Sequence, residues 1–147
     1  MLYFAYGSNL NHQQMHKRCK GSKYIKNFFL QNYKLSFSHK SKNTVYGHAN
    51  IEKRKNSKVP GAIWVITKKH VNKLDEYEGV SYNYYKKKYF LINKKKVLVY
   101  IQNKYFLKKP SSIYLHTIIK GYKDCNLDIS YLKKRIKNYT TKYKILW

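Results

Sequence analysis

Acidic side chains are rare in this chain, and half of the 6 lie within one short segment, as Asp75, Glu76 and Glu78. On a helical wheel advancing about 100° per residue, Glu78 projects between Val71 and Leu74, whereas Glu76 points away. Burial and the negative end of the helix dipole are both expected to raise the pKa of Glu78, as a general acid/base requires. The segment alone leaves a second interpretation open, an exposed helix-terminal glutamate paired with a lysine.

A glycine-containing turn near the start of the chain is the second candidate. The segment Tyr6-Gly7-Ser8-Asn9-Leu10 follows a short apolar run and precedes a polar stretch, as at a strand-to-helix turn. Exposed backbone N–H groups at such a turn bind anions, and glycine lets a ligand approach the main chain. By itself the same turn is more typical of residues that serve geometry and capping only.

Other residues able to do chemistry form weaker patterns. His12 and His16 are four positions apart on a predicted helix, but they have no third ligand and no intervening Glu, which favours surface histidines over a metal site. His48 is expected to be structural. Cys19 and Cys125 form no paired-cysteine spacing, which favours two reduced thiols. The sequence therefore predicts no metal and no cofactor.

Several motifs occur along the chain in an order that resembles the gamma-glutamylcyclotransferase family. They are Phe4 to Leu10 (Phe-Ala-Tyr-Gly-Ser-Asn-Leu), Val59 to Trp64 (Val-Pro-Gly-Ala-Ile-Trp) and Leu74 to Val80 (Leu-Asp-Glu-Tyr-Glu-Gly-Val). The similarity extends to Tyr46–Ile51 and Ser112–Gly121, so it spans nearly the whole chain. It implies a small closed or strongly curved mixed β-barrel flanked by helices, with the ligand cavity at one mouth.

The resemblance also implies roles for individual residues. It assigns the catalytic glutamate to Glu78, and it implies that several tyrosines line the substrate pocket. The loop sequence resembles the branch that acts on gamma-glutamyl amino acids more than the branches specific for glutathione or gamma-glutamylamines. The substrate-binding residues implied are Tyr6, Gly7, Ser8, Asn9, Leu10, Tyr85, Tyr100 and Tyr114.

The reaction of the family is an intramolecular aminolysis of a small anionic gamma-glutamyl substrate. The substrate's α-amino nitrogen attacks its own γ-carbonyl carbon, which closes the ring of 5-oxoproline and releases an amine without metal or external nucleophile. The resemblance gives Glu78 the proton transfers. A reference Glu pKa of about 4.3 against an α-amino pKa near 8 leaves roughly 5 kcal/mol of uphill transfer. We therefore expect a raised Glu78 pKa and few lysines in the pocket.

The charge of the chain raises an alternative. The chain has 32 Lys and Arg but only 6 Asp and Glu, which gives it a net charge of +26. Such a charge is typical of a nucleic-acid-binding protein. Arginine recognises nucleic-acid bases and phosphates better than lysine does, but it occurs only at Arg18, Arg54 and Arg135. The lysines lie in scattered short runs. Both observations favour a solvated basic surface over a nucleic-acid site. A basic nucleic-acid-binding protein on the same fold stays open. So does a related cyclotransferase acting on glutathione or on a gamma-glutamyl-capped intermediate.

Length and composition bound the fold. At 147 residues and 43% hydrophobic, the chain is long enough for one core, and we expect one gamma-glutamylcyclotransferase-like domain over residues 1–147. No run approaches the roughly 18 apolar residues of a membrane span, and no charged leader precedes Leu2, so a soluble cytoplasmic protein is expected. The sequence does not indicate the oligomeric state.

The pattern of apolar residues predicts about six strands interspersed with helices, an α+β fold. Lys53–Lys58 is predicted to be a charged loop, Thr67 a helix cap, and Gly79 and Gly121 helix ends. The predicted core includes Trp64, Phe90 and Trp147. The predicted strands are Leu2–Tyr6, Phe28–Ser38, His48–Glu52, Pro60–Ile66, Tyr84–Ile92 and Val97–Gln102, and the helices follow Ser8, Thr67, Pro110 and Asp128.

Overall fold

A strongly curved sheet forms the frame of the protein in the computed structural model, which describes residues 1–139. Within them the sheet has six strands in the order β4-β5-β1-β3-β2-β6. Strand β1 runs parallel to β5, and the other neighbours are antiparallel, so the sheet is mixed. The strands are β1 (Leu2–Ala5), β2 (Lys23–His39), β3 (His48–Val65), β4 (Lys86–Ile92), β5 (Lys95–Ile101) and β6 (Phe106–Leu107).

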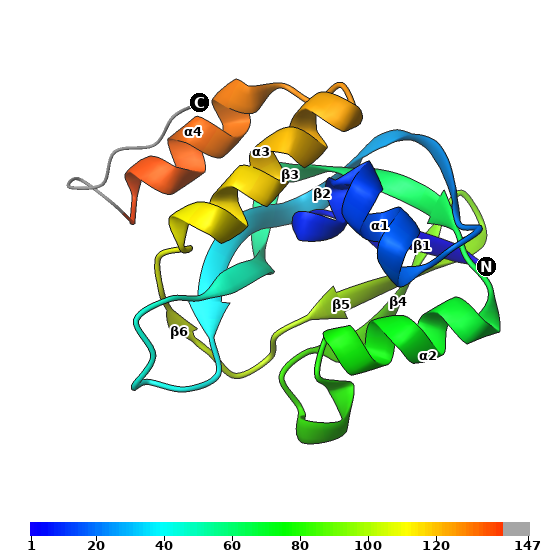
Figure 1. Cartoon of the computed structure of the whole chain (residues 1–147). Helices are drawn as coiled ribbons and strands as arrows, with labels where there is room; N and C mark the ends of the chain where they lie inside the picture. Colours follow the sequence, from blue (N-terminus) through cyan, green and yellow to red (C-terminus); the bar gives the residue numbers. More distant parts are fainter. Residues whose placement is uncertain (140–147) are drawn as a thin grey trace.

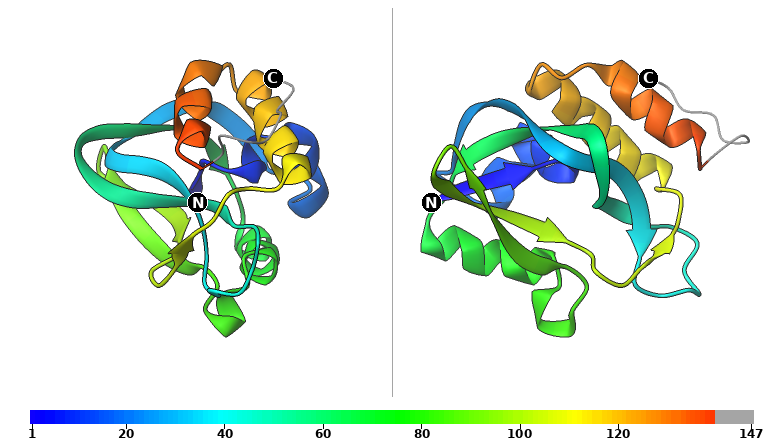
Figure 2. Two further views of the ribbon diagram at one scale, coloured as in Figure 1. Left: turned by 90° about the vertical axis from the view of Figure 1, so that its left-hand side faces the viewer. Right: turned by 180° about the vertical axis from the view of Figure 1, so that it is seen from behind.

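Helices cover this sheet from two sides, which confirms the predicted α+β class (Figures 1 and 2). Helices α3 and α4 pack side by side over β2 and β3, and α2 lies beside β4 and β5. Among residues 1–139 no helix has the length and apolar character needed to cross a membrane. The helices are α1 (His12–Arg18), α2 (Lys68–Tyr77), α3 (Ser112–Asp124) and α4 (Ile129–Lys137), with short 3-10 turns η1 (Ser8–Leu10) and η2 (Val80–Tyr82).

The long ribbon of β2 and β3 corrects one prediction. Lys53–Lys58, predicted to be a charged loop, lies within β3: its end residues Lys58 and Lys53 pair with Gln31 and Tyr33 of β2, and the residues between them form an irregularity in the ladder. Asn32 and Asn56 take left-handed φ values of 66° and 64° there, and the Asn56 N–H donates to Asn32 Oδ1 at 3.3 Å. The lysine side chains stay in water while the ladder continues on both sides of the irregularity, so a polar composition does not prevent a strand here.

The core lies between the sheet and the helices. Trp64 is fully buried, as predicted, and Phe90 is partly buried; Trp147 lies outside the described residues. The predicted cap of α2 is confirmed, since Thr67 Oγ1 accepts from the His70 N–H at 3.2 Å. This cap fixes the start of the helix whose far end carries Glu78.

Gly121 does not end α3, as the sequence predicts, but lies inside it, because the helix runs on to Asp124. A Cβ added at Gly121 would lie 2.6 Å from Leu10 Cβ and 2.7 Å from the Asn11 nitrogen. The glycine is therefore needed for close packing, because a residue without a side chain lets α3 lie directly on the backbone of η1. The contact ties the start of the chain to the helix that carries Tyr114.

Replacing Gly121 with alanine is expected to destabilise the protein. Helix propensity alone would favour alanine by up to about 1 kcal/mol. The overlap with the η1 backbone should outweigh that gain and cost about 1–3 kcal/mol, with a lower Tm in thermal unfolding. His116→Ala, at an exposed position of the same helix, is the matched control and should change stability by less than about 0.5 kcal/mol. A rise in Tm for Gly121→Ala would contradict the packing argument.

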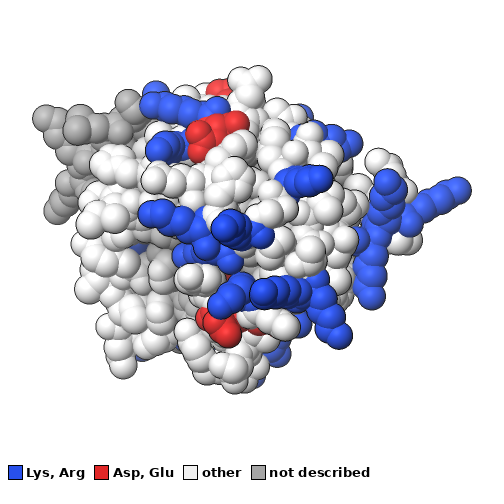
Figure 3. Space-filling model, turned by 45° about the vertical axis from the view of Figure 1, so that its right-hand side comes forward, with Lys and Arg blue, Asp and Glu red and all other residues white. Residues whose placement is uncertain are grey.

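Basic side chains are spread over the face of the molecule seen in Figure 3. Figure 3 shows Lys and Arg side chains over several parts of one face, with uncharged surface between them and a few acidic groups. On the face shown, the charge is distributed rather than gathered into one compact cluster.

Candidate active site

Glu78 stands at the C-terminal end of α2, where the predicted helix stop is confirmed. Its N–H donates to the Leu74 oxygen at 2.8 Å, and Gly79 then takes a left-handed φ of 64° that turns the chain into η2. The Glu78 oxygen accepts from the Tyr85 N–H at 3.1 Å, so the backbone is held on both sides. Val71 and Leu74 are buried, as the helical wheel predicts, and Glu78 faces inward with them.

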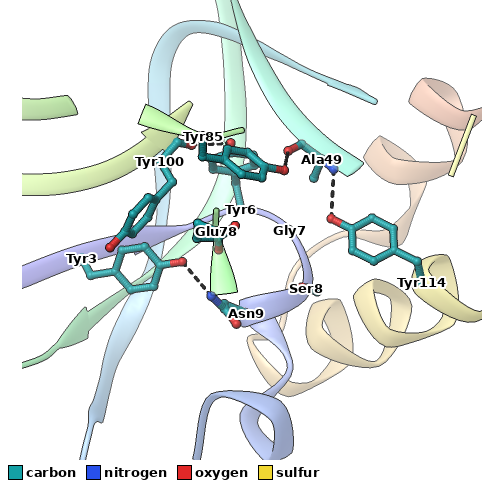
Figure 4. A pocket seen from close by; sticks show the side chains of 10 residues that line it. All are labelled: Tyr3, Tyr6, Gly7, Ser8, Asn9, Ala49, Glu78, Tyr85, Tyr100 and Tyr114. Carbon is teal, nitrogen blue, oxygen red and sulfur yellow. Dashed lines mark hydrogen bonds between the residues drawn. The ribbon is translucent and has the colours of Figure 1, made fainter. Parts of the chain in front are cut away.

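The Glu78 side chain borders a pocket, which we call the inner pocket (Figure 4). The pocket has about 330 Å³ of space free of protein atoms, a volume that includes its open mouth. The lining residues are Tyr3, Tyr6, Gly7, Ser8, Asn9, Ala49, Glu78, Tyr85, Tyr100 and Tyr114.

The surroundings of Glu78 in the inner pocket raise its pKa. Burial raises the pKa of Glu78 from its ordinary 4.5 to about 7, and the positive charge of Arg18 opposes the rise. The residue is partly exposed because it borders the pocket, yet protein atoms surround the carboxylate closely. Within residues 1–139 no side-chain hydrogen bond or ion pair engages that carboxylate, and no lysine lines the inner pocket. The expectation of a raised pKa in a pocket with few lysines is confirmed.

The predicted loop and tyrosines surround this carboxylate, with one exception. Leu10 is fully buried in the core and does not line the pocket. The hydroxyl of Tyr85 donates to the Ala49 oxygen at 2.5 Å, and that of Tyr100 donates to Asp75 Oδ1 at 2.7 Å. Tyr114 Oη accepts from the Ala49 N–H at 2.9 Å, which leaves its own proton available to donate.

Sequence reasoning missed Tyr3 and Ala49 as pocket residues. Tyr3 is 4% exposed on β1, and its oxygen accepts from Asn9 Nδ2 at 3.0 Å, so its proton is also available to donate. A tyrosine on a buried strand needs a partner for its hydroxyl, and that requirement is the signal that could have identified Tyr3. Ala49 carries no such signal, because only the β2–β3 register brings its backbone to the pocket.

A second cavity, the outer pocket, adjoins the first and has about 480 Å³ of free space, including its mouth. It shares Glu78 with the inner pocket, so the carboxyl group lies at the junction of the two. His48, expected to be structural, lines the outer pocket, with Nδ1 at 2.5 Å from Tyr84 Oη. The outer pocket shares Ser8, Glu78, Tyr85 and Tyr114 with the inner one and adds Gln14, Arg18, His48, Tyr77 and Tyr84.

No metal site accompanies these pockets in the described part of the chain. The rings of His12 and His16 lie 6.3 Å apart, and among residues 1–139 no three His, Cys, Asp or Glu side chains are grouped to hold a metal ion. The groups at hand are instead a carboxyl of raised pKa, the backbone of Gly7 to Asn9 and two available tyrosine protons. Groups of these kinds, brought together on a small α+β fold, are able to support general acid/base chemistry on a small ligand.

Comparisons with known proteins show the family to which the chain belongs. The family model described as "Gamma-glutamyl cyclotransferase, AIG2-like" matches residues 3–118. The gamma-glutamylcyclotransferases of Homo sapiens and Bos taurus are 32% and 30% identical over 142 residues, which cover 90% of this chain and 76% of each relative. A solved structure described as a gamma-glutamyl cyclotransferase superposes with a TM-score of 0.79 at 29% identity, covering 99% of this chain and 92% of that one. This chain belongs to the gamma-glutamyl cyclotransferase, AIG2-like family, a family of cyclising enzymes.

Proposed function

We propose that this protein is a gamma-glutamylcyclotransferase that releases 5-oxoproline from gamma-glutamyl amino acids, with Glu78 as its general acid/base. The observation that carries the proposal is the carboxyl group of raised pKa at the junction of two pockets, one of them bordered by Gly7, Ser8 and Asn9. In this reaction the nucleophile and the electrophile both belong to the substrate. The protein must therefore fold the glutamyl chain and move protons, which the groups present can do.

The pKa of Glu78 suits the first proton transfer. Glu78 would accept a proton from the substrate ammonium, whose ordinary pKa is near 8, and later return it to the leaving amine. With a Glu78 pKa of about 7, the uphill cost of the first transfer falls to roughly 1–2 kcal/mol. A lysine beside the carboxylate would lower its pKa again, so the lysine-free lining of the inner pocket supports this role.

The Gly7 to Asn9 loop would bind the negative groups of the substrate. The Gly7 and Ser8 oxygens accept from the Leu10 and Asn11 N–H groups at 3.1 and 3.0 Å, which fixes the turn. The N–H groups at the start of such a turn have no partner within it and are free for a carboxylate or a developing oxyanion. The available protons of Tyr3 and Tyr114 would add donors on either side.

The test is a panel of gamma-glutamyl-alanine, glutathione and ε-(gamma-glutamyl)-lysine, assayed for 5-oxoproline by chromatography. We expect the highest kcat/KM with gamma-glutamyl-alanine. A preference for glutathione would favour the related cyclotransferase instead. Failure to form 5-oxoproline from any of the three would contradict the proposed activity.

The surface charge supports a weaker, additional proposal. The net charge of +26, with lysines over much of the face in Figure 3, would allow non-specific nucleic-acid binding. Such binding would weaken steeply with salt and would not respond to changes at Glu78.

The proposal also includes a cytoplasmic location, supported by the free, buried thiols of Cys19 and Cys125.

A further inference from the structure

The outer pocket contains a cation that the chemistry described above does not use. Among the described residues that line the inner and outer pockets, Arg18 is the one with a permanent positive charge. His48, on the same outer pocket, does not supply charge at neutral pH, because burial lowers its pKa from 6.5. A ligand in the outer pocket therefore meets one fixed cation.

The Arg18 side chain is held in place from two directions. One guanidinium nitrogen, Nη1, donates to Asn9 Oδ1 at 3.2 Å, and the guanidinium carbon lies 4.3 Å from the centroid of the Tyr77 ring. Gln14, one helical turn earlier, donates to the same Asn9 oxygen at 3.0 Å and to Ser8 Oγ at 2.8 Å. The guanidinium is thus fixed relative to the substrate loop, while most of its five N–H donors remain for a ligand.

The position of Glu78 determines which part of a substrate would meet Arg18. The scissile nitrogen has to lie within reach of Glu78, which borders both pockets. With the glutamyl group in the smaller inner pocket, the leaving amine extends into the outer one. In a gamma-glutamyl amino acid, a carboxylate lies two bonds beyond that nitrogen, and a planar guanidinium is the side chain best suited to bind it.

We propose that the outer pocket is a subsite for the leaving group, in which Arg18 binds the α-carboxylate of the departing amino acid. This inference rests on the proposed function and adds its selectivity: the enzyme prefers gamma-glutamyl amino acids over gamma-glutamylamines. Arg18 is in this view a substrate-binding residue. Tyr77 and Asn9 hold its guanidinium in position.

The experiment compares two substrates that differ only in this carboxylate, gamma-glutamyl-alanine and gamma-glutamyl-ethylamine. Each enzyme is assayed for 5-oxoproline on the plateau of its own pH profile, because loss of Arg18 also lets the pKa of Glu78 rise. We expect Arg18→Gln to lower kcat/KM for gamma-glutamyl-alanine about 10- to 100-fold and that for gamma-glutamyl-ethylamine less than about threefold. Arg18→Lys should fall between, because lysine keeps the charge but lacks the planar fork.

Lys17→Gln is the matched control, since it removes the same charge from an exposed position next to Arg18 that lines neither pocket. It should leave both substrates unchanged. The inference is overturned if Arg18→Gln and Arg18→Lys lower kcat/KM equally for both substrates, or for neither. Either result would leave the proposed function standing. If the unmodified enzyme forms no 5-oxoproline from either substrate, the proposed function falls, and the inference falls with it.

Discussion

Glu78→Gln is expected to lower the rate of 5-oxoproline release by at least about 10²- to 10⁴-fold, the usual contribution of a positioned acid/base group. Glutamine has nearly the same shape as glutamate, so it preserves the packing at the end of α2. It cannot accept the substrate proton, because its amide has no basic site of comparable strength. The measurement is kcat with gamma-glutamyl-alanine, and Glu76→Gln, at an exposed position of the same helix, should retain full activity.

The same substitution should stabilise the protein above neutral pH. The folded state raises the pKa of Glu78 from 4.5 to about 7, so the stability provided by the protonated carboxyl is present below pH 4.5. That stability is lost as the pH rises through about 7, at a total cost of up to about 3 kcal/mol. Urea unfolding should therefore show Glu78→Gln more stable than the unmodified protein at pH 8 but similar to it at pH 4.5. If Glu78→Gln keeps its activity, Glu78 is not the general acid/base. If its stability difference from the unmodified protein is the same at both pH values, the pKa of Glu78 is not raised in the folded state.

Gly7→Ala is expected to lower kcat/KM by about 10²-fold, because small displacements of a positioning group have effects of that size. A Cβ added at Gly7 would lie 2.8 Å from Ala49 Cβ, closer than carbon atoms approach without a shift. The loop or β3 must then move, which displaces the backbone N–H groups proposed to bind the substrate. Activity equal to that of the unmodified protein would show that the position of this loop is not critical.

A second substitution tests whether the contact between the added methyl group and Ala49 causes the expected loss of kcat/KM. The double variant Gly7→Ala/Ala49→Gly removes the methyl group that the new one meets, and the next neighbour, Tyr114 Oη, is 3.4 Å away. Activity should return in large part. Ala49→Gly alone should stay active, since the backbone N–H and oxygen that contact Tyr114 and Tyr85 remain. If the double variant is no better than Gly7→Ala, steric overlap with Ala49 does not explain the loss.

The sequence was sufficient for features that depend on local periodicity. Glu78 shares a helix face with Val71 and Leu74, and the wheel correctly predicted that it faces inward. The Thr67 cap and the Gly79 stop are likewise local, since each depends on residues within four positions. The family motifs added the Gly7 to Asn9 loop, which periodicity alone could not distinguish from an ordinary turn.

What the sequence could not provide depends on contacts between distant segments. Lys53–Lys58 looks like a loop because the β2 residues that pair with its two ends, Tyr33 and Gln31, lie twenty or more positions earlier. Gly121 looks like a helix end because the reason for a glycine there is its close contact with Leu10, which lies far away in the sequence. Arg18 is one basic residue among 32 in the sequence, and only the folded chain places it in a pocket.

The segment from Gly7 to Leu10, whose Ser8 lines both pockets, is held closely at its two ends. Ala49 contacts it closely at Gly7, and α3 contacts it closely at Leu10 through Gly121. A binding site built on a clamped backbone gives up little conformational entropy when a ligand arrives, so more of the contact energy remains as affinity. New substrate preferences would then arise most readily by changes in the walls around the departing group, while the clamp itself persists through evolutionary divergence.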